Sequence, residues 1–174
     1  MKNGSSPVYV RQAEETDLPQ IAFLNGIAFA GNRASPEAAN KWVRCWWEAF
    51  PLYQYFVAVE GKGKGARILG YIGWKIDGGF ARDLPVLELE QIAVDPTLQN
   101  RGIARQLIEK SYPFAIEVVK QENPAAKNVR MIVWFYGDNK HAQKLYEGFF
   151  KEGEGGRRDQ YGKEEVMYMV TLSL

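Results

Sequence analysis

The sequence predicts a mixed α/β fold with helices on both faces of one central sheet. Hydrophobic periodicity gives the element order β-α-α-β-β-β-α-β-α-β-β, and three of those strands follow one another in the middle of the chain. Neither a doubly wound fold nor a barrel contains such a run. With 174 residues, 46% of them hydrophobic and 25% charged, the chain has the size and composition of one globular domain, so we expect residues 1–174 to form a single domain.

Alternation and helix caps predict the first strand and the first two helices. Residues 8–12 (VYVRQ) alternate as a short strand. Thr16 or Asp17 then caps a helix. Its apolar stripe is Leu18, Ile21, Leu24 and Ile27. Ser35 as N-cap and Pro36 at the first helical position begin a second helix. The stripe of that helix is Trp42, Trp46 and Phe50.

Glycine-rich turns separate the three middle strands. Residues 53–60 and 67–77 form a hairpin around the turn at 61–65. After a loop that begins at Gly78, residues 86–94 form the third of these strands.

The second half of the chain alternates helices and strands. A helical pattern runs from about residue 101 to residue 122, and Pro113 inside it predicts a kink or two abutting helices. Residues 129–136 are nearly all apolar, which predicts a strand buried on both faces. A helix over 139–150 and two strands, near 151–158 and 165–172, complete the pattern.

The charge balance and the few cysteine and histidine residues exclude several classes of function. Lysine and arginine total 22 against 21 aspartate and glutamate, so we expect no nucleic-acid partner. Cys45 and His141 are the single residues of their types, which excludes a disulfide and a zinc site built from His and Cys. We expect Cys45 to be a buried structural thiol and the location to be cytoplasmic. No apolar run has the length of a membrane span, and the first residues lack the apolar core of a signal peptide.

The segment 87–110 carries the most information about function. A strand ends at Val94, Asp95 and Pro96 turn the chain, and residues 99–104 open the long helix. The first N–H groups of a helix lack intrahelical partners and lie at the positive end of its dipole, so they can bind an anion. Small residues at 102 and 104 would allow close approach, although they are equally compatible with ordinary helix packing.

This segment resembles the acetyl-CoA pyrophosphate loop of the GNAT superfamily of N-acetyltransferases. Gln99, Gly102 and Ala104 fill the fixed positions of that loop, after a strand ending in Val-Asp-Pro. Downstream, the pattern Asn139-x-x-Ala142-x-x-Leu145-Tyr146-Glu147 resembles the second signature of the family. The resemblance covers nearly the whole chain. It implies a GNAT-like, mostly antiparallel central sheet of about seven strands flanked by about four helices.

The second signature also has a physical rationale. At 100° per residue, Asn139 and Tyr146 lie within about 20° of the same helix face. The resemblance implies that Asn139 binds a pantetheine amide and that Tyr146 lies near the thioester sulfur. A plain core stripe of Ala142, Leu145 and Phe149 is the alternative interpretation. The sequence departs from the family after this helix, where Gly148 arrives earlier than the usual glycine.

The strand at residues 86–94 supplies the candidate catalytic carboxylates. Glu88 and Glu90 project from one face together with Ile92 and Val94 if alternation holds, although the resemblance implies a bulge on this strand. Glu88 takes the position of the catalytic base in the histone acetyltransferase branch, and Glu90 is the second candidate. Each could instead be an exposed strand residue or an ion-pair partner.

The resemblance implies direct transfer of an acetyl group from acetyl-CoA to an amine, without a metal. Tyr146 would protonate the leaving thiolate, and Glu88 or Glu90 would take the proton of the amine. The residues implied to bind the co-substrate are Ile92, Ala93, Val94, Gln99, Asn100, Arg101, Gly102, Ile103, Ala104, Arg105 and Asn139.

The acceptor side is not specified by these motifs. We expect a small-molecule amine or a peptide N-terminus as acceptor, no membrane partner, and a monomer or homodimer. A catalytically silent acyl-CoA-binding or regulatory module of the same fold is the competing hypothesis, and retention of Tyr146 and of the strand carboxylates argues against it. A toxin-type or protein N-terminal acetyltransferase is a further alternative.

Overall fold

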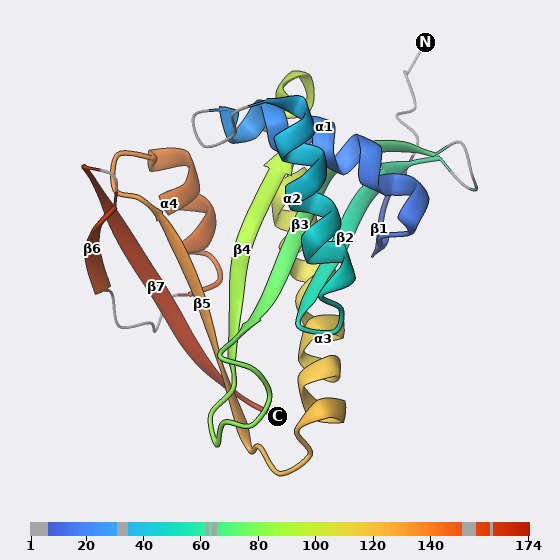
Figure 1. The fold of residues 1–174 in the computed structure, drawn as a ribbon. Coiled ribbons are helices and arrows are strands. Elements are labelled where there is room, and N and C mark those ends of the chain that lie inside the picture. Colours follow the sequence, from blue (N-terminus) through green and yellow to red (C-terminus); the bar gives the residue numbers. More distant parts are fainter. Residues whose placement is uncertain (1–6, 31–34, 62, 64–65, 151–155, 161) are drawn as a thin grey trace. The chain divides into compact units, whose positions relative to one another are not determined.

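The computed structural model describes residues 7–30, 35–61, 63, 66–150, 156–160 and 162–174. Seven strands form one sheet in the order β1-β2-β3-β4-β5-β7-β6 (Figure 1). They are β1 (Val8–Gln12), β2 (Tyr53–Glu60), β3 (Arg67–Asp77), β4 (Val86–Val94), β5 (Asn128–Tyr136), β6 (Gly156–Gln160) and β7 (Lys163–Ser173). Pairing is parallel between β4 and β5 and antiparallel between β1 and β2, β5 and β7, and β6 and β7. The predicted mixed, mostly antiparallel sheet is confirmed.

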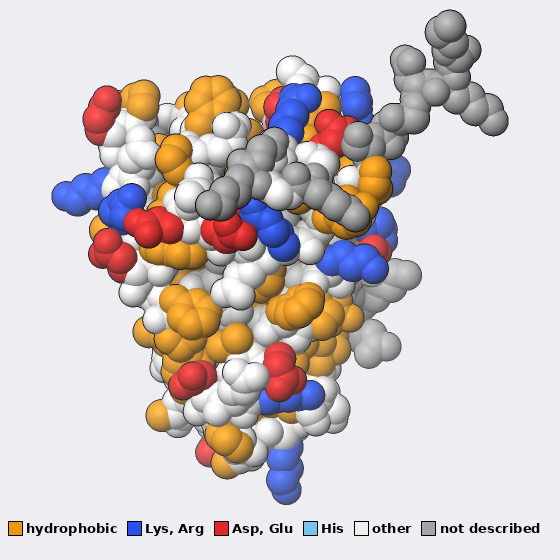
Figure 2. Space-filling view, turned by 90° about the vertical axis from the view of Figure 1, so that its right-hand side faces the viewer, with side chains coloured by type: hydrophobic (Ala, Val, Ile, Leu, Met, Phe, Trp, Pro, Cys, Tyr) orange, Lys and Arg blue, Asp and Glu red, His pale blue; other side chains and the backbone are white. Residues whose placement is uncertain are grey.

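The described residues form four α-helices and two short 3₁₀ helices. The α-helices are α1 (Leu18–Ala28), α2 (Pro36–Glu48), α3 (Ile103–Glu122) and α4 (Lys140–Tyr146), and the 3₁₀ helices are η1 (Glu15–Asp17) and η3 (Pro96–Leu98). Among the described residues, no helix is both long and apolar enough to span a membrane. Acidic and basic side chains are interspersed on the face shown in Figure 2.

Two compact units divide the chain, and each is described by itself. Unit 1 comprises Met1–Gly73 and Gln91–Pro113, and unit 2 comprises Trp74–Glu90 and Phe114–Leu174. Unit 1 therefore contains the loop between β4 and α3. Unit 2 contains α4 and both candidate carboxylates.

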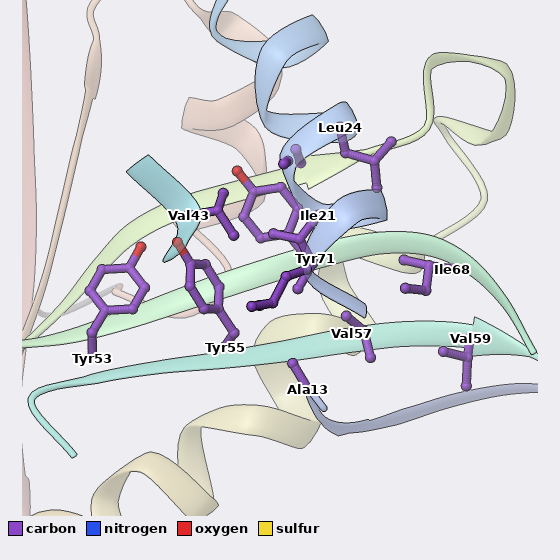
Figure 3. Packing of buried hydrophobic residues seen from close by; sticks show 13 residues of the cluster. Ala13, Ile21, Leu24, Val43, Tyr53, Tyr55, Val57, Val59, Ile68 and Tyr71 are labelled. Atoms are coloured by element: carbon purple, nitrogen blue, oxygen red, sulfur yellow. The ribbon is translucent and has the colours of Figure 1, made fainter. Parts of the chain in front are cut away.

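The core of unit 1 lies where α1 and α2 cover β2 and β3 (Figures 1 and 3). Aromatic rings form a series through it: Trp46 lies 4.7 Å from Tyr53, Tyr53 lies 4.8 Å from Tyr55, and Tyr55 lies 5.9 Å from Tyr71, all between ring centroids. A Cβ atom at Gly73 would lie 2.1 Å from the hydroxyl oxygen of Tyr53. Glycine at this position therefore leaves room for the side chain of Tyr53 against β3.

In unit 2, β5 lies between β4 and β7, and α4 packs against it. The ring of Tyr146 lies 5.4 Å from the ring of Phe135, which also contacts Tyr168 at 5.0 Å. The amide of Asn123, just after α3, donates to the backbone oxygens of Phe80 at 2.6 Å and Arg82 at 2.8 Å. These two hydrogen bonds attach the β3–β4 loop to the end of α3.

Several expectations about the helices need correction. Asp17 is the N-cap residue of α1, as expected, but its carboxylate accepts from Arg11 and from the backbone N–H of Glu14 and makes no capping hydrogen bond to α1. Ile27 is 44% exposed, whereas the polar Asn25 takes its place in the core. Phe50 lies beyond the end of α2 and is exposed, because α2 ends at Glu48. Cys45 is exposed and not a buried thiol.

The second half of the chain also differs in detail. α3 is one helix with Pro113 inside it, not two abutting helices. β5 alternates between buried and partly exposed positions, because only one of its faces is fully covered. α4 ends at Tyr146, short of the predicted residue 150. The final two strands are present as β6 and β7, and the predicted start near residue 151 lies outside the described residues.

Candidate active site

Asp95 organises the turn that leads from β4 to α3 in unit 1. Its side chain accepts hydrogen bonds from the backbone N–H of Thr97 at 2.9 Å and from the Thr97 hydroxyl at 2.7 Å. Its own backbone N–H donates to the carbonyl of Leu69 at 2.9 Å, which continues the pairing with β3. The hydrogen bonds to Thr97, with a smaller contribution from Arg67 at 3.3 Å, lower the pKa of Asp95. This carboxylate therefore stays ionised and holds η3 in place before the loop.

The loop itself has two residues in the left-handed region. Asn100 has φ of 62° and Gly102 has φ of 77°, and the carbonyl of Gly102 accepts from Gln106 N–H at 3.0 Å. Gly102 is thus the last residue before α3, and the N–H groups that follow it are the first of the helix. A Cβ atom at Gly102 would meet no atom within 4 Å. The backbone here is open to a ligand, as the predicted anion site requires.

Arginine side chains accompany this helix start. Arg101 and Arg105 are both exposed, and Arg105 forms an i,i+4 ion pair with Glu109 at 3.5 Å. Such an exposed pair is weak, so the Arg105 guanidinium can exchange Glu109 for a phosphate oxygen. Gln99 and Asn100 are exposed beside it, whereas Ile103 is buried and anchors α3.

The end of β4, Ile92–Val94, lies close to β3 at Gly70. A Cβ atom there would be 2.7 Å from the carbonyl oxygen of Ala93 and 3.2 Å from the Cα of Val94. Any larger residue would push the β4 backbone away. Gly70 therefore sets the path of the three residues that are predicted to contact pantetheine.

In unit 2, Glu88 and Glu90 share one cation. The Nζ of Lys75 lies 2.9 Å from Glu88 Oε2, 3.7 Å from Glu90 Oε2 and 3.4 Å from Asp77 Oδ1. Burial alone lowers the pKa of Lys75, but the hydrogen bond to Glu88 and the three nearby carboxylates outweigh burial, and the net pKa is raised. The cluster combines one positive and three negative groups, and the Glu90 side chain, 23% exposed, is more accessible than that of Glu88 at 12%.

The contacts of β3 and β4 indicate a break in alternation. Glu90 contacts Lys75, and the next residue, Gln91, contacts Tyr71. Lys75 and Tyr71 are four residues apart on β3 and so project from the same face, whereas adjacent residues of β4 should project from opposite faces. One of the two strands therefore departs from alternation between these contacts, as a β-bulge does.

The two residues of the second signature have different environments in unit 2. Asn139 is exposed and is the N-cap of α4, where its Oδ1 accepts from Ala142 N–H at 3.0 Å. Tyr146 is the last residue of α4 and is 5% exposed, packed between Phe135 and Phe150. Burial raises the pKa of the Tyr146 hydroxyl well above its usual value near 10. The phenol is therefore neutral at all ordinary pH values and can donate a hydrogen bond.

Sequence reasoning missed two groups of residues beside the predicted ones. Lys75 was not singled out, although it binds both candidate carboxylates. Asn25, Tyr71 and Gln91 form a buried hydrogen-bonded group beside the end of β4. The available signal was the presence of polar residues inside otherwise apolar helix and strand patterns.

The structure brings the predicted residues together in two sets. The loop residues 99–105 and Ile92–Val94 belong to unit 1. Glu88, Glu90, Asn139 and Tyr146 belong to unit 2, where the two carboxylates meet at Lys75 and Tyr146 lies in the aromatic cluster.

Comparisons with solved structures show that this fold is shared. A plant NAA60 from Arabidopsis thaliana, crystallised with a bisubstrate analogue, superposes with a TM-score of 0.64 at 16% identity, over 97% of this chain and 99% of that one. A ribosomal-protein-S5-alanine acetyltransferase from Vibrio fischeri gives 0.66 at 18% identity over 94% and 92% of the two chains. The aminoglycoside N-acetyltransferase AAC(6')-Iy, in complex with CoA, gives 0.68 at 21% identity over 92% and 97%.

The sequence itself matches a family model. A search against curated proteins found no match. The model described as the acetyltransferase (GNAT) family matches residues 26–149, well over half of the chain and including both signatures. The chain belongs to the GNAT family of acetyltransferases.

Proposed function

We propose that this protein transfers an acetyl group directly from acetyl-CoA to the amine of a small molecule or of a protein N-terminus. The observation that carries the proposal is the loop before α3. It presents a left-handed glycine with open space above it at the start of a helix, between two exposed arginines. A pyrophosphate needs this combination of unshielded N–H groups and nearby positive charge.

The residues of the loop, of β4 and of the start of α4 fit CoA. The backbone at 99–105 would hold the pyrophosphate, and Arg101 and Arg105 would neutralise its charge. The backbone of Ile92–Val94 would hydrogen-bond pantetheine like an added strand. Because the Oδ1 of Asn139 already caps α4, its contribution to pantetheine would be the amide Nδ2 as donor to a carbonyl.

The groups in unit 2 supply the proton transfers. The neutral amine would attack the thioester carbonyl carbon, so that the C–N bond forms and the C–S bond breaks, and the second proton of the nitrogen would pass to water as the thiolate leaves. Glu90, the more accessible carboxylate, or Glu88 takes the proton of the ammonium form, directly or through water. Lys75 limits the negative charge of these carboxylates and holds them in place. Tyr146 donates a hydrogen bond to the leaving sulfur.

Other features support the same proposal. The family model extends across both units, which favours one domain over residues 1–174. The solved relatives include an aminoglycoside acetyltransferase and a ribosomal-protein-alanine acetyltransferase, and both names denote transfer to an amine. The net negative cluster around Lys75 favours an acceptor that arrives as a cation. We place the protein in the cytoplasm, where acetyl-CoA is available, as a monomer or homodimer.

The test measures acetyl-CoA turnover with four acceptors: a polyamine, a free amino acid, an aminoglycoside and a short peptide with a free N-terminus. We expect thiol release with at least one of them, and loss of that activity in Gly102→Glu, which places bulk and negative charge in the open space. CoA should also raise the melting temperature. Stabilisation by CoA without turnover of any acceptor would favour the silent acyl-CoA-binding module. Absence of stabilisation by CoA and acetyl-CoA would refute the proposal.

A further inference from the structure

Three polar side chains form a closed hydrogen-bonded ring inside unit 1. The Nδ2 of Asn25 donates to the hydroxyl oxygen of Tyr71 at 2.8 Å and to Oε1 of Gln91 at 2.9 Å. The Tyr71 hydroxyl in turn donates to the same Oε1 at 3.1 Å. Asn25 and Tyr71 are 0% exposed and Gln91 is 6% exposed. The ring therefore links α1, β3 and β4 through direct hydrogen bonds between buried side chains.

The arrangement fixes the direction of each hydrogen bond. Gln91 accepts twice with one oxygen, so its amide group has one orientation. The amide of Asn25 must present its nitrogen to both partners. A buried polar network of this kind holds its members in one geometry, because any displacement leaves a desolvated donor or acceptor without a partner.

The ring lies immediately before the part of β4 that the proposed function uses. Gln91 is followed by Ile92–Val94, and Gly70, beside Tyr71 in β3, contacts Ala93 and Val94. Two features therefore constrain the same part of β4. The ring holds the side chain of Gln91, and the absence of a side chain at Gly70 sets the backbone path at Ala93 and Val94. Apolar packing alone would not need Asn25 in this position, since a leucine would fill a buried site on α1.

We infer that Asn25, acting through Tyr71 and Gln91, is a positioning residue that aligns the β4 backbone at Ile92–Val94 for acetyl transfer. The inference rests on the proposed function, in which this backbone contacts pantetheine and the thioester carbonyl. Misalignment of catalytic groups by a fraction of an ångström reduces the rate of the chemical step. In the proposed function, co-substrate affinity comes mostly from the pyrophosphate loop at 99–105, whereas the hydrogen bonds of the ring join residues 25, 71 and 91. The ring should therefore affect kcat more than CoA binding.

Two variants test the ring and one serves as the control. Asn25→Ala removes the hydrogen bonds from Asn25 Nδ2 to Tyr71 and Gln91, and Tyr71→Phe deletes one hydroxyl but keeps the aromatic side chain and the hydrogen bond between Asn25 and Gln91. Leu24→Ala changes the adjacent residue of α1, which is 2% exposed and has an apolar side chain. The readouts are melting temperature, the Kd of CoA by calorimetry, and kcat for thiol release from acetyl-CoA. The acceptor is whichever of the four panel compounds gives the highest rate, or water if none does.

We expect kcat to fall about tenfold in Asn25→Ala and about threefold in Tyr71→Phe, while the Kd of CoA changes less than about twofold. Leu24→Ala should lose at least as much thermal stability as Tyr71→Phe and keep kcat within about twofold of wild type at a temperature where it is folded. If Asn25→Ala does not fold, the comparison of kcat between Tyr71→Phe and Leu24→Ala tests the inference.

Two results would overturn the inference while leaving the proposed function intact. One is a wild-type enzyme that binds CoA and turns over, with kcat in the ring variants no lower than in Leu24→Ala. The other is an equal loss of kcat and CoA affinity, which would assign the ring to general stability. A folded wild-type protein that fails to bind CoA would refute the proposed function itself, and the inference with it.

Discussion

Replacing Gly102 with alanine separates backbone strain from ligand contact. In the free protein a Cβ atom at this position meets nothing within 4 Å, so the substitution causes no steric clash. It does place an L-residue at φ of 77°, which costs about 1–2 kcal/mol. For a chain of this size, each kcal/mol lowers the melting temperature by about 2–4 °C. We therefore expect Gly102→Ala to fold and to melt about 2–8 °C lower.

The effect on CoA binding should be much larger. The new methyl group would occupy the space through which the pyrophosphate approaches the first N–H groups of α3. We expect the Kd of CoA to rise at least about tenfold, which corresponds to about 1.4 kcal/mol of lost binding free energy. Wild type at 100 times its Kd gains about 2.7 kcal/mol of stability from CoA, and the variant at the same CoA concentration should gain about half of that or less.

Gly79→Ala is the matched control. Gly79 lies in the β3–β4 loop, has φ of 78° and likewise leaves open space at the Cβ position. It should show the same loss of melting temperature in the free protein and an unchanged Kd for CoA by calorimetry. If both variants bind CoA as tightly as wild type, the loop before α3 does not hold the pyrophosphate, and the reasoning from its open backbone is wrong.

Three further predictions concern catalysis, capping and pH. Tyr146→Phe should leave CoA affinity unchanged and lower kcat about 100-fold. This is near the lower end of general-acid effects, because burial makes the phenol a weak acid. A kcat equal to that of wild type would show that Tyr146 is only a packing residue. Ser35→Ala removes the N-cap hydrogen bond of α2, in which Ser35 Oγ accepts from Ala38 N–H at 3.2 Å. In urea titrations this variant should lower the free energy of unfolding by about 1 kcal/mol, whereas Ser35→Thr should not. Because the folded-state pKa of Lys75 is raised above 10.5, its contribution to stability is complete below pH 10.5 and is lost as the pH rises through the folded value. Urea titrations between about pH 9.5 and 11.5 should then show a smaller decline of stability for Lys75→Met than for wild type, and equal declines would contradict this assignment.

The sequence determined the elements whose limits are set by local chemistry. Gly61 directly follows β2, and Gly78 directly follows β3. The predicted strands 53–60, 67–77 and 86–94 agree with the structure to the residue. Ser35 and Pro36 likewise begin α2 as expected. Caps and turns act over four or five residues, so the residues that decide them are adjacent in the chain.

The sequence also predicted an anion site at the loop before α3, because a strand end, small residues at 102 and 104 and a helix start are contiguous, whereas the function class came from the resemblance to the GNAT family, which the family model confirms. The roles of individual side chains were harder to predict from the sequence. The pattern showed that Glu88 and Glu90 share a face, but it contained nothing to indicate that Lys75 lies between them. That pairing depends on the register of β3 against β4, which a departure from alternation shifts.

The tertiary structure alone decided which face of each helix is buried and what its polar residues do. Periodicity placed Ile27 in the core of α1, yet Ile27 is exposed and Asn25 is buried. The reason is that apolar periodicity measures only the average hydrophobicity of a face. A buried asparagine is stable where residues of two strands accept hydrogen bonds from its amide. Tyr71 and Gln91 come close to α1 only when the helix has packed on the sheet.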